Sequence, residues 1–312
     1  MSKKYTIIFA GTSEFAVPSL TKLSQADFID LALVITQPEK PAGRQKELLP
    51  SPVKTIAQEL NLNLSQPNKI IEIKDQLEKI KPDLGIVVSY GQIIPPAILD
   101  LPKLGWLNLH PSLLPKYRGS SPIQNAILNN DSETGISLML LDSKMDHGPV
   151  LVQEKVKLDK KYTAVELTNF LADKAGELLI ENLANYLDGK IESQVQDDNL
   201  ASFTKIITKY DGKIDWQKSA TEIECQIRAY FPWPGSFTFW NSKRLKIIAS
   251  KVAELEIKNK KPGQVFVEEN KILIACGQGV LEIEKLQLEG KLEMSAEIFI
   301  RGYADLAGQI LN

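Results

Sequence analysis

The residues best suited to chemistry in this chain are an amide and an imidazole two positions apart, Asn108 and His110. His110 is one of only 2 histidines in 312 residues, and it lies between an apolar run and a proline-rich loop. In a β-strand, residues i and i+2 face the same side. If residues 104–110 form a strand, both side chains project from its carboxyl end. Acyl-group transfer needs such a pair, because one group stabilises an oxyanion and the other moves a proton.

A carboxylate that can serve this pair lies downstream, in residues 141–150. Asn-x-His is a short and common pattern, and alone it is more often a loop histidine bonded to a backbone carbonyl. The segments 111–119 and 141–150 favour a site instead. Asp146 is the carboxylate of interest, whereas the adjacent His147 is expected to be a structural loop residue, since neighbouring side chains seldom aim at one point.

Several of these segments carry a family resemblance. Residues 108–119, Asn-Leu-His-Pro-Ser-Leu-Leu-Pro-Lys-Tyr-Arg-Gly, and residues 146–150, Asp-His-Gly-Pro-Val, resemble the catalytic signature of the folate-dependent formyltransferases. Further segments resemble the branch of that family that acts on methionyl-tRNA; they are residues 9–16, 36–44, 49–54, 213–216 and 228–234. The resemblance therefore covers essentially the whole chain.

The resemblance implies a reaction and a role for each residue. The donor would be 10-formyltetrahydrofolate, and the acceptor the α-amino group of initiator methionyl-tRNA. Asn108 would donate to the tetrahedral oxyanion. His110 would stabilise the same charge or protonate the departing folate nitrogen, while Asp146 would hold the imidazole and take the proton of the amine. The residues implied to line the folate pocket are Ser89, Tyr90, Gly91, His110, Pro111, Ser112, Leu113 and Asp142.

The sequence itself offers no obvious nucleophile or metal cluster. No serine or cysteine stands out as a nucleophile, so we predict direct transfer without a covalent enzyme intermediate and without a metal ion. The turn at Gly11 lacks the G-x-G-x-x-G spacing of dinucleotide-binding proteins, which argues against a nicotinamide cofactor.

The loop from Gln37 to Pro50 is the best candidate for contact with RNA. It carries Lys40, Arg44 and Lys46 among several prolines, which favour an irregular backbone outside helix and sheet. The net charge of −2 gives no general sign of a nucleic-acid binder. On charge alone this would be a solvated surface loop, and only its resemblance to an acceptor-stem loop favours tRNA binding.

Strands and helices alternate through the first part of the chain. Apolar strands are predicted at residues 5–10, 28–36, 62–64, 82–89 and 104–110, and helices at 15–23, 52–60, 71–80, 119–128 and 163–187. This order predicts an α/β fold with a Rossmann-like, mostly parallel sheet covered by helices on both faces. Ligands bind such sheets at the carboxyl ends of the strands, where residues 89–91 and 108–110 lie.

The length of the chain and the change near residue 210, from alternating strands and helices to a series of short strands, predict two domains. We expect a catalytic domain of residues 1–189, a linker of residues 190–209 and a C-terminal domain of residues 210–312. A helix at 220–229 and short strands at 236–240, 245–252, 264–267, 272–275 and 280–288 predict a small OB-like β-barrel. By the resemblance, this domain is expected to bind tRNA.

Composition sets further expectations. The chain is 43% hydrophobic and 24% charged, which is typical of an ordinary globular protein. Cys225 and Cys276 are too few for a zinc site or a disulfide framework and are expected to be buried. A secretory leader and a bilayer-length apolar run are both missing from the sequence, so we expect a cytoplasmic protein that does not bind membranes. We also expect a monomer.

Alternatives remain open on the residues alone. A sugar-nucleotide formyltransferase would share Asn108, His110 and Asp146 but would not need the basic loop. A formyltetrahydrofolate hydrolase would use similar residues with water as the acceptor. A non-catalytic RNA-binding or folate-binding protein would have no reason to keep the three side chains together.

Overall fold

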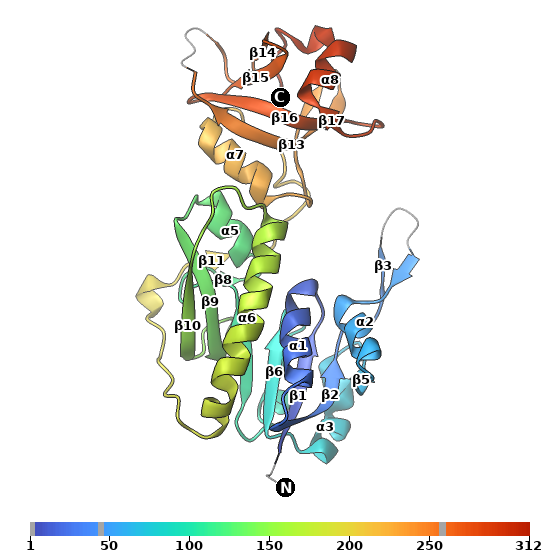
Figure 1. Cartoon of the computed structure of the whole chain (residues 1–312), viewed down its shortest axis with the longest axis vertical. Coiled ribbons are helices and arrows are strands. Elements are labelled where there is room, and N and C mark those ends of the chain that lie inside the picture. Colours follow the sequence, from blue (N-terminus) through green and yellow to red (C-terminus); the bar gives the residue numbers. More distant parts are fainter. Residues whose placement is uncertain (1–3, 43–46, 256–259) are drawn as a thin grey trace. The chain divides into compact units, whose positions relative to one another are not determined.

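The computed structural model describes residues 4–42, 47–255 and 260–312 and divides the chain into two compact units (Figure 1). The first comprises Met1–Pro122, Thr134–Lys157 and Thr168–Thr204. The second comprises Ile123–Glu133, Leu158–Leu167 and Lys205–Asn312. Each unit is built around its own sheet.

The first unit holds a seven-stranded sheet in the order β10-β9-β7-β6-β1-β2-β5. Its strands are β1 (Tyr5–Gly11), β2 (Ile29–Ile35), β5 (Leu64–Ser65), β6 (Leu84–Val88), β7 (Trp106–His110), β9 (Glu133–Leu140) and β10 (Val150–Lys157). The five strands from β7 to β5 run parallel, and β9 pairs antiparallel with β7. The predicted α/β fold with a mostly parallel sheet is confirmed.

Helical segments connect the strands. They are η1 (Glu14–Ala16), α1 (Val17–Ser24), α2 (Pro52–Glu59), η2 (Ile70–Ile73), α3 (Lys74–Ile80), α4 (Pro96–Leu99), α5 (Pro122–Leu128) and α6 (Ala164–Leu187). The hydroxyl of Ser51 accepts a hydrogen bond from the Lys54 amide, so it caps the start of α2. The periodic leucines of α6, including Leu171 and Leu179, are fully buried. The predicted helix at 119–128 begins only at Pro122, because Gly119 belongs to the short strand β8 (Arg118–Gly119).

The loop from Gln37 to Pro50 contains a short hairpin of β3 (Lys40–Ala42) and β4 (Glu47–Leu49). The expectation that prolines keep this segment out of a sheet was therefore wrong. Pro41 stands opposite Leu48 in a two-stranded ribbon, and both strands of such a ribbon are edge strands, where proline is tolerated. Of the residues predicted to contact RNA, Lys40 lies in β3, while Arg44 and Lys46 lie outside the described residues.

Residues 190–204, which fall in the predicted linker, group with the first unit. They contain η3 (Asp198–Leu200) and β11 (Phe203–Thr204), and β11 pairs with β8. Gln194 forms two backbone hydrogen bonds with Val150 at the start of β10. This segment is thus fastened to the same unit as the catalytic candidates.

Residues 205–312 of the second unit form an antiparallel sheet with the helices α7 and α8. Its strands follow the order β12-β13-β16-β15-β14, and β17 pairs with β16. The elements are α7 (Ala220–Ala229), β12 (Ser236–Trp240), β13 (Lys243–Ala253), β14 (Val265–Glu268), β15 (Lys271–Ala275), β16 (Val280–Leu288), β17 (Met294–Ser295), α8 (Ala296–Gly302) and η4 (Ala304–Leu306). A capping box of Ser219 and Glu222 begins α7.

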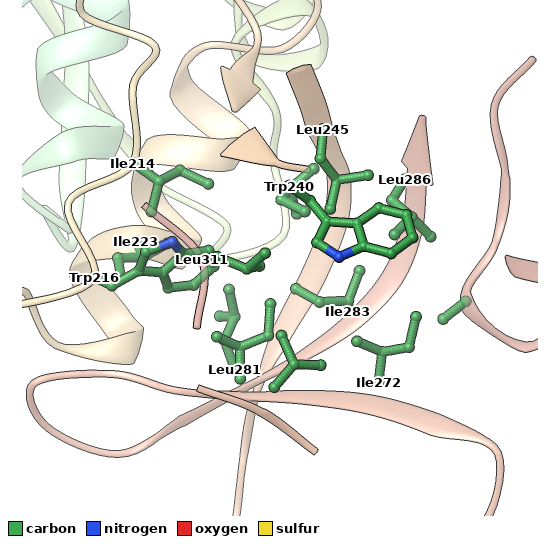
Figure 2. Close-up of a cluster of buried hydrophobic side chains, with 14 of the residues drawn as sticks. Ile214, Trp216, Ile223, Trp240, Leu245, Ile272, Leu281, Ile283, Leu286 and Leu311 are labelled. Carbon is green, nitrogen blue, oxygen red and sulfur yellow. The ribbon is translucent and has the colours of Figure 1, made fainter. Parts of the chain in front are cut away.

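The C-terminal residues of the second unit close this sheet towards a barrel. The amides of Gly308 and Leu311 donate to the carbonyls of Val265 and Gly263 beside β14, while the carbonyl of Asn312 accepts from Phe239 in β12. The last residues therefore lie between the two edge strands, as a small β-barrel requires. Trp216, Trp240 and Phe299 fill the interior together with aliphatic side chains of the sheet (Figure 2).

Both cysteines are free and buried, as predicted. Burial raises the pKa of the Cys276 thiol to about 12 and also raises the pKa of Cys225, so both remain protonated near neutral pH. In the part of the chain that the structure describes, every helix is too short or too polar to cross a membrane.

A carboxylate at the start of the second unit makes its stability depend on pH. Asp211 accepts hydrogen bonds from the Lys205 ammonium at 2.8 Å and from the hydroxyl and amide of Thr208, both at 2.7 Å. These contacts, led by Lys205, lower the pKa of Asp211 from 3.8 to about 2. A lowered folded-state pKa stabilises the protein above the unfolded pKa, and this contribution is lost as the pH falls from 3.8 towards 2.

We therefore expect Asp211→Asn to destabilise the protein by up to about 2 kcal/mol near neutral pH at low ionic strength. The difference from the wild type should shrink as the pH is lowered through the same range, because the wild-type carboxyl is then protonated too. Urea unfolding followed by tryptophan fluorescence at a series of pH values measures it. A difference that stays constant with pH would contradict the assignment.

Candidate active site

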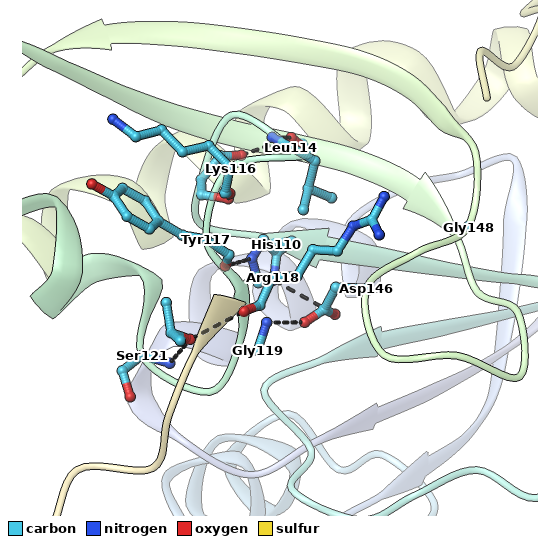
Figure 3. A network of polar contacts seen from close by, with 12 residues as sticks. His110, Leu114, Lys116, Tyr117, Arg118, Gly119, Ser121, Asp146 and Gly148 are labelled. Atoms are coloured by element: carbon cyan, nitrogen blue, oxygen red, sulfur yellow. Dashed lines mark hydrogen bonds and ion pairs between the residues drawn. The ribbon is translucent and has the colours of Figure 1, made fainter. Parts of the chain in front are cut away.

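His110 ends β7 and is buried, with 4% of its surface exposed. Its Nε2 lies 2.9 Å from the backbone carbonyl of Tyr117, which can only accept a hydrogen bond. Nε2 must therefore carry a proton, and Nδ1 is the nitrogen that can gain or lose one. Nδ1 faces Asp146, at 3.7 Å from its Oδ1 (Figure 3). The structure thus brings together two of the three predicted catalytic residues, which lie 36 positions apart in the sequence.

The carboxylate of Asp146 is positioned by backbone. Its Oδ2 accepts a hydrogen bond of 2.7 Å from the amide of Gly119, which leaves Oδ1 to face the imidazole (Figure 3). Gly119 has a φ of +110°, and a Cβ there would lie 2.6 Å from the carbonyl of Thr204, so the position requires glycine. Asp146 itself has a φ of +48°, a left-handed conformation that its surroundings must stabilise.

Asn108 lies in the middle of the sheet rather than at an edge. It stands opposite Val87 of β6 and Met139 of β9. The alternation of the strand places its side chain on the same face as His110. Its amide is therefore carried by a strand that is paired on both sides, next to the end where His110 meets Asp146.

The residues expected to line a folate pocket fall into two groups. Ser89 and Gly91 are exposed at the carboxyl end of β6, directly beside the end of β7, and the Ser89 hydroxyl accepts from Ser13 at 2.7 Å. The side chain of Tyr90 does not lie at this strand end with its neighbours. It packs in the hydrophobic core with 2% of its surface exposed, and burial raises its pKa to about 12.

The second group follows β7, and its polar side chains form hydrogen bonds within the protein. Pro111 and Leu113 are half-buried, whereas Ser112 is buried and its hydroxyl donates to the Lys116 carbonyl at 2.5 Å. Asp142 accepts from the amide of Lys144 at 2.8 Å and contacts His147 Nδ1 at 2.5 Å. Its carboxylate thus organises the loop from Asp142 to Gly148, and any contact with a ligand would be additional.

Sequence reasoning missed a polar network around this loop. Arg118, which is 3% exposed, donates from Nε to Gln196 Oε1 at 3.0 Å and from Nη1 to Asp198 Oδ1 at 2.8 Å. His147 Nε2 lies 3.5 Å from the other oxygen of Asp198. The Arg118 hydrogen bond, helped by the charge of His147, holds the pKa of Asp198 below its usual value. Arg118 stands in the family signature, but Gln196 and Asp198 lie in a polar segment with no local motif.

The carboxyl ends of the parallel strands, where ligands of such sheets bind, carry an imidazole and a carboxylate that face each other and an amide on the same strand, a set of groups suited to acyl transfer. The chain belongs to the formyl transferase family. Residues 3–183 match the formyl transferase domain, and residues 206–304 match the formyl transferase C-terminal domain.

Curated relatives agree with this assignment, and a solved structure shares the fold. A protein of Acidobacterium capsulatum named methionyl-tRNA formyltransferase is 44% identical over 300 residues, which is 95% of this chain and 96% of the relative. One of the same name from Dehalococcoides mccartyi is 43% identical over 97% of this chain and 96% of the relative. The N-formyltransferase of Helicobacter canadensis, solved with folinic acid and dTDP-3-aminofucose, has a TM-score of 0.69. At 22% identity over 90% of this chain and 98% of that chain, it shows the shared fold alone.

Proposed function

We propose that this protein transfers the formyl group of 10-formyltetrahydrofolate to the α-amino group of initiator methionyl-tRNA. The observation that carries the proposal is the pairing of His110 Nδ1 with Asp146 at the strand end next to Asn108. The name shared by relatives that are 43–44% identical over nearly the whole chain supports methionyl-tRNA as the acceptor. We further propose that the protein acts as a monomer in the cytoplasm, where translation uses its product.

In this proposal the amine attacks the formyl carbon, and the carbonyl oxygen becomes an oxyanion. The amide of Asn108 donates a hydrogen bond to that oxygen, which stabilises it by about 3–4 kcal/mol in comparable sites. Asp146 accepts the proton of the attacking amine. His110, whose Nε2 is held by Tyr117, uses Nδ1 to stabilise the charge or to protonate the departing folate nitrogen.

The C-terminal domain is the proposed partner of the tRNA body. Exposed aromatic surface supports this role, because Trp233 is 60% and Phe239 is 40% exposed. Arg244 lies over the ring of the buried Phe237 with its guanidinium carbon 3.7 Å from the centroid, and Phe237 packs edge-on against Phe239, so a cation lies close to one of these exposed rings. The segment that carries Lys40, Arg44 and Lys46 is proposed to contact the acceptor stem.

The test is a formyl-transfer assay with three candidate acceptors: initiator tRNA charged with methionine, the same tRNA uncharged, and a nucleotide-linked amino sugar. We expect formylation of the charged tRNA alone. Release of formate without an acceptor would indicate a hydrolase, and formylation of the sugar would indicate a different transferase. Arg44→Ala should raise KM for tRNA with little change in KM for the folate, because the loop is proposed to contact only RNA. If the KM for tRNA did not change, the segment would be an ordinary surface loop with no role in tRNA binding.

A further inference from the structure

We propose that Gln196 is a positioning residue that holds Asp146 in its working place; the inference rests on the proposed function for its kinetic test. The side-chain amide of Gln196 donates two hydrogen bonds, at 2.9 Å to the carbonyl of Asp146 and at 2.7 Å to the carbonyl of Gly148. These carbonyls lie on either side of His147. One amide thus fastens both sides of the turn that presents the catalytic carboxylate.

Only one orientation of this amide satisfies its hydrogen bonds to Arg118 and to the loop. Carbonyl oxygens can only accept hydrogen bonds, and the Nε of Arg118 can only donate, so Nε2 of Gln196 must face the loop and Oε1 must face Arg118. Arg118 is itself fixed by Asp198 and is buried. An orientation determined from both ends makes Gln196 a rigid brace rather than an incidental contact.

Gln196 completes a closed ring of contacts that begins and ends at Asp146. The Gly119 amide holds the Asp146 carboxylate, Arg118 is joined to Gly119 by a peptide bond, and Gln196 connects the Arg118 side chain back to the Asp146 carbonyl. Both ends of Asp146 are therefore fixed to one dipeptide. This is the support that a residue with a φ of +48° needs, since such a backbone persists only when its surroundings hold it.

The segment that carries Gln196 is held by other contacts. Gln194 pairs its backbone with Val150 in both directions, and the Asp197 carboxylate accepts from the Asn199 amide at 2.9 Å. Removing the Gln196 side chain should therefore leave the segment in place and release only the loop. The exposed Gln194 is a matched control, because it is the same residue type two positions away.

The kinetic experiment compares Gln196→Ala, Gln196→Glu and Gln194→Ala in formyl transfer to methionyl-tRNA. Glutamate keeps an acceptor for Arg118 but loses both donors to the loop. We expect kcat to fall roughly 100-fold in both Gln196 variants with each KM changed less than about twofold, because a displacement near 1 Å costs about this much. Gln194→Ala should match the wild type. Wild-type kcat in the folded Glu variant would overturn the inference, and so would failure of both Gln196 variants to fold.

A second measurement does not depend on the reaction. In protein labelled with ¹⁵N-histidine, the two imidazole rings give separate signals, and His147→Gln assigns them. We expect the His110 ring signals to shift in Gln196→Ala and Gln196→Glu, since Asp146 moves relative to Nδ1, and to stay unchanged in Gln194→Ala. Unmoved His110 signals in both Gln196 variants would overturn the inference. A wild type that does not formylate methionyl-tRNA would refute the proposed function, while this comparison would still decide the role of Gln196.

Discussion

Asp146→Asn is expected to lower kcat for formyl transfer by roughly 1,000-fold, which corresponds to about 4 kcal/mol of transition-state stabilisation. The asparagine oxygen can still accept from the Gly119 amide, so the side chain should keep its place. What is lost is the charge that faces His110 Nδ1 at 3.7 Å, and with it the ability to accept the proton of the amine. The substitution should therefore keep the position of the side chain and remove only its negative charge and its ability to accept a proton.

Single-turnover formylation of methionyl-tRNA measures this loss, and titration with a folate analogue shows whether the donor still binds. Asp188→Asn is the control, because that carboxylate pairs with Lys190 on the surface of the same unit. It should retain full activity. If Asp146→Asn kept more than about a tenth of the wild-type kcat, the carboxylate would have no role as a proton acceptor.

Strand periodicity was enough to predict the α/β fold of the first unit and the place of Asn108 and His110 on one strand. The apolar runs of β1 and β6 are buried on both faces, which is typical of central parallel strands. The i, i+2 spacing then placed Asn108 beside His110. The approach of Asp146 was foreseen from the family signature, but its structural basis is the hydrogen bond from the amide of Gly119, which periodicity and spacing do not indicate.

The rest of the site depends on contacts between distant positions. The Arg118–Gln196 hydrogen bond joins residues 78 apart, and the Gln196–Asp146 hydrogen bond joins residues 50 apart. A glutamine in a polar stretch carries no periodic signal, so Gln196 fell within the linker predicted at residues 190–209. Tyr90 was expected to line the folate pocket with its neighbours Ser89 and Gly91. Those two positions are exposed at the strand end, but the side chain of Tyr90 packs in the hydrophobic core.

Combining His110→Ala with Asp146→Asn should reveal that the two side chains act as one unit. His110→Ala alone is expected to lower kcat roughly 100- to 1,000-fold, since it removes the group that stabilises the developing charge. In the double variant, each substitution removes a side chain whose partner has already been removed, so the second substitution should cost little further kcat. Its kcat should therefore lie within about threefold of the slower single variant, rather than at the product of the two losses.

The measurement is a double-mutant cycle on kcat, with unfolding temperatures and folate affinity of all four proteins as controls. Asn108 supplies the contrasting case. Its amide is proposed to act on the oxyanion independently of the His110–Asp146 pair, so the loss from Asn108→Ala should multiply with that from Asp146→Asn. If His110 and Asp146 instead gave multiplicative losses, the 3.7 Å approach of Nδ1 and Oδ1 would be structural proximity without shared chemistry.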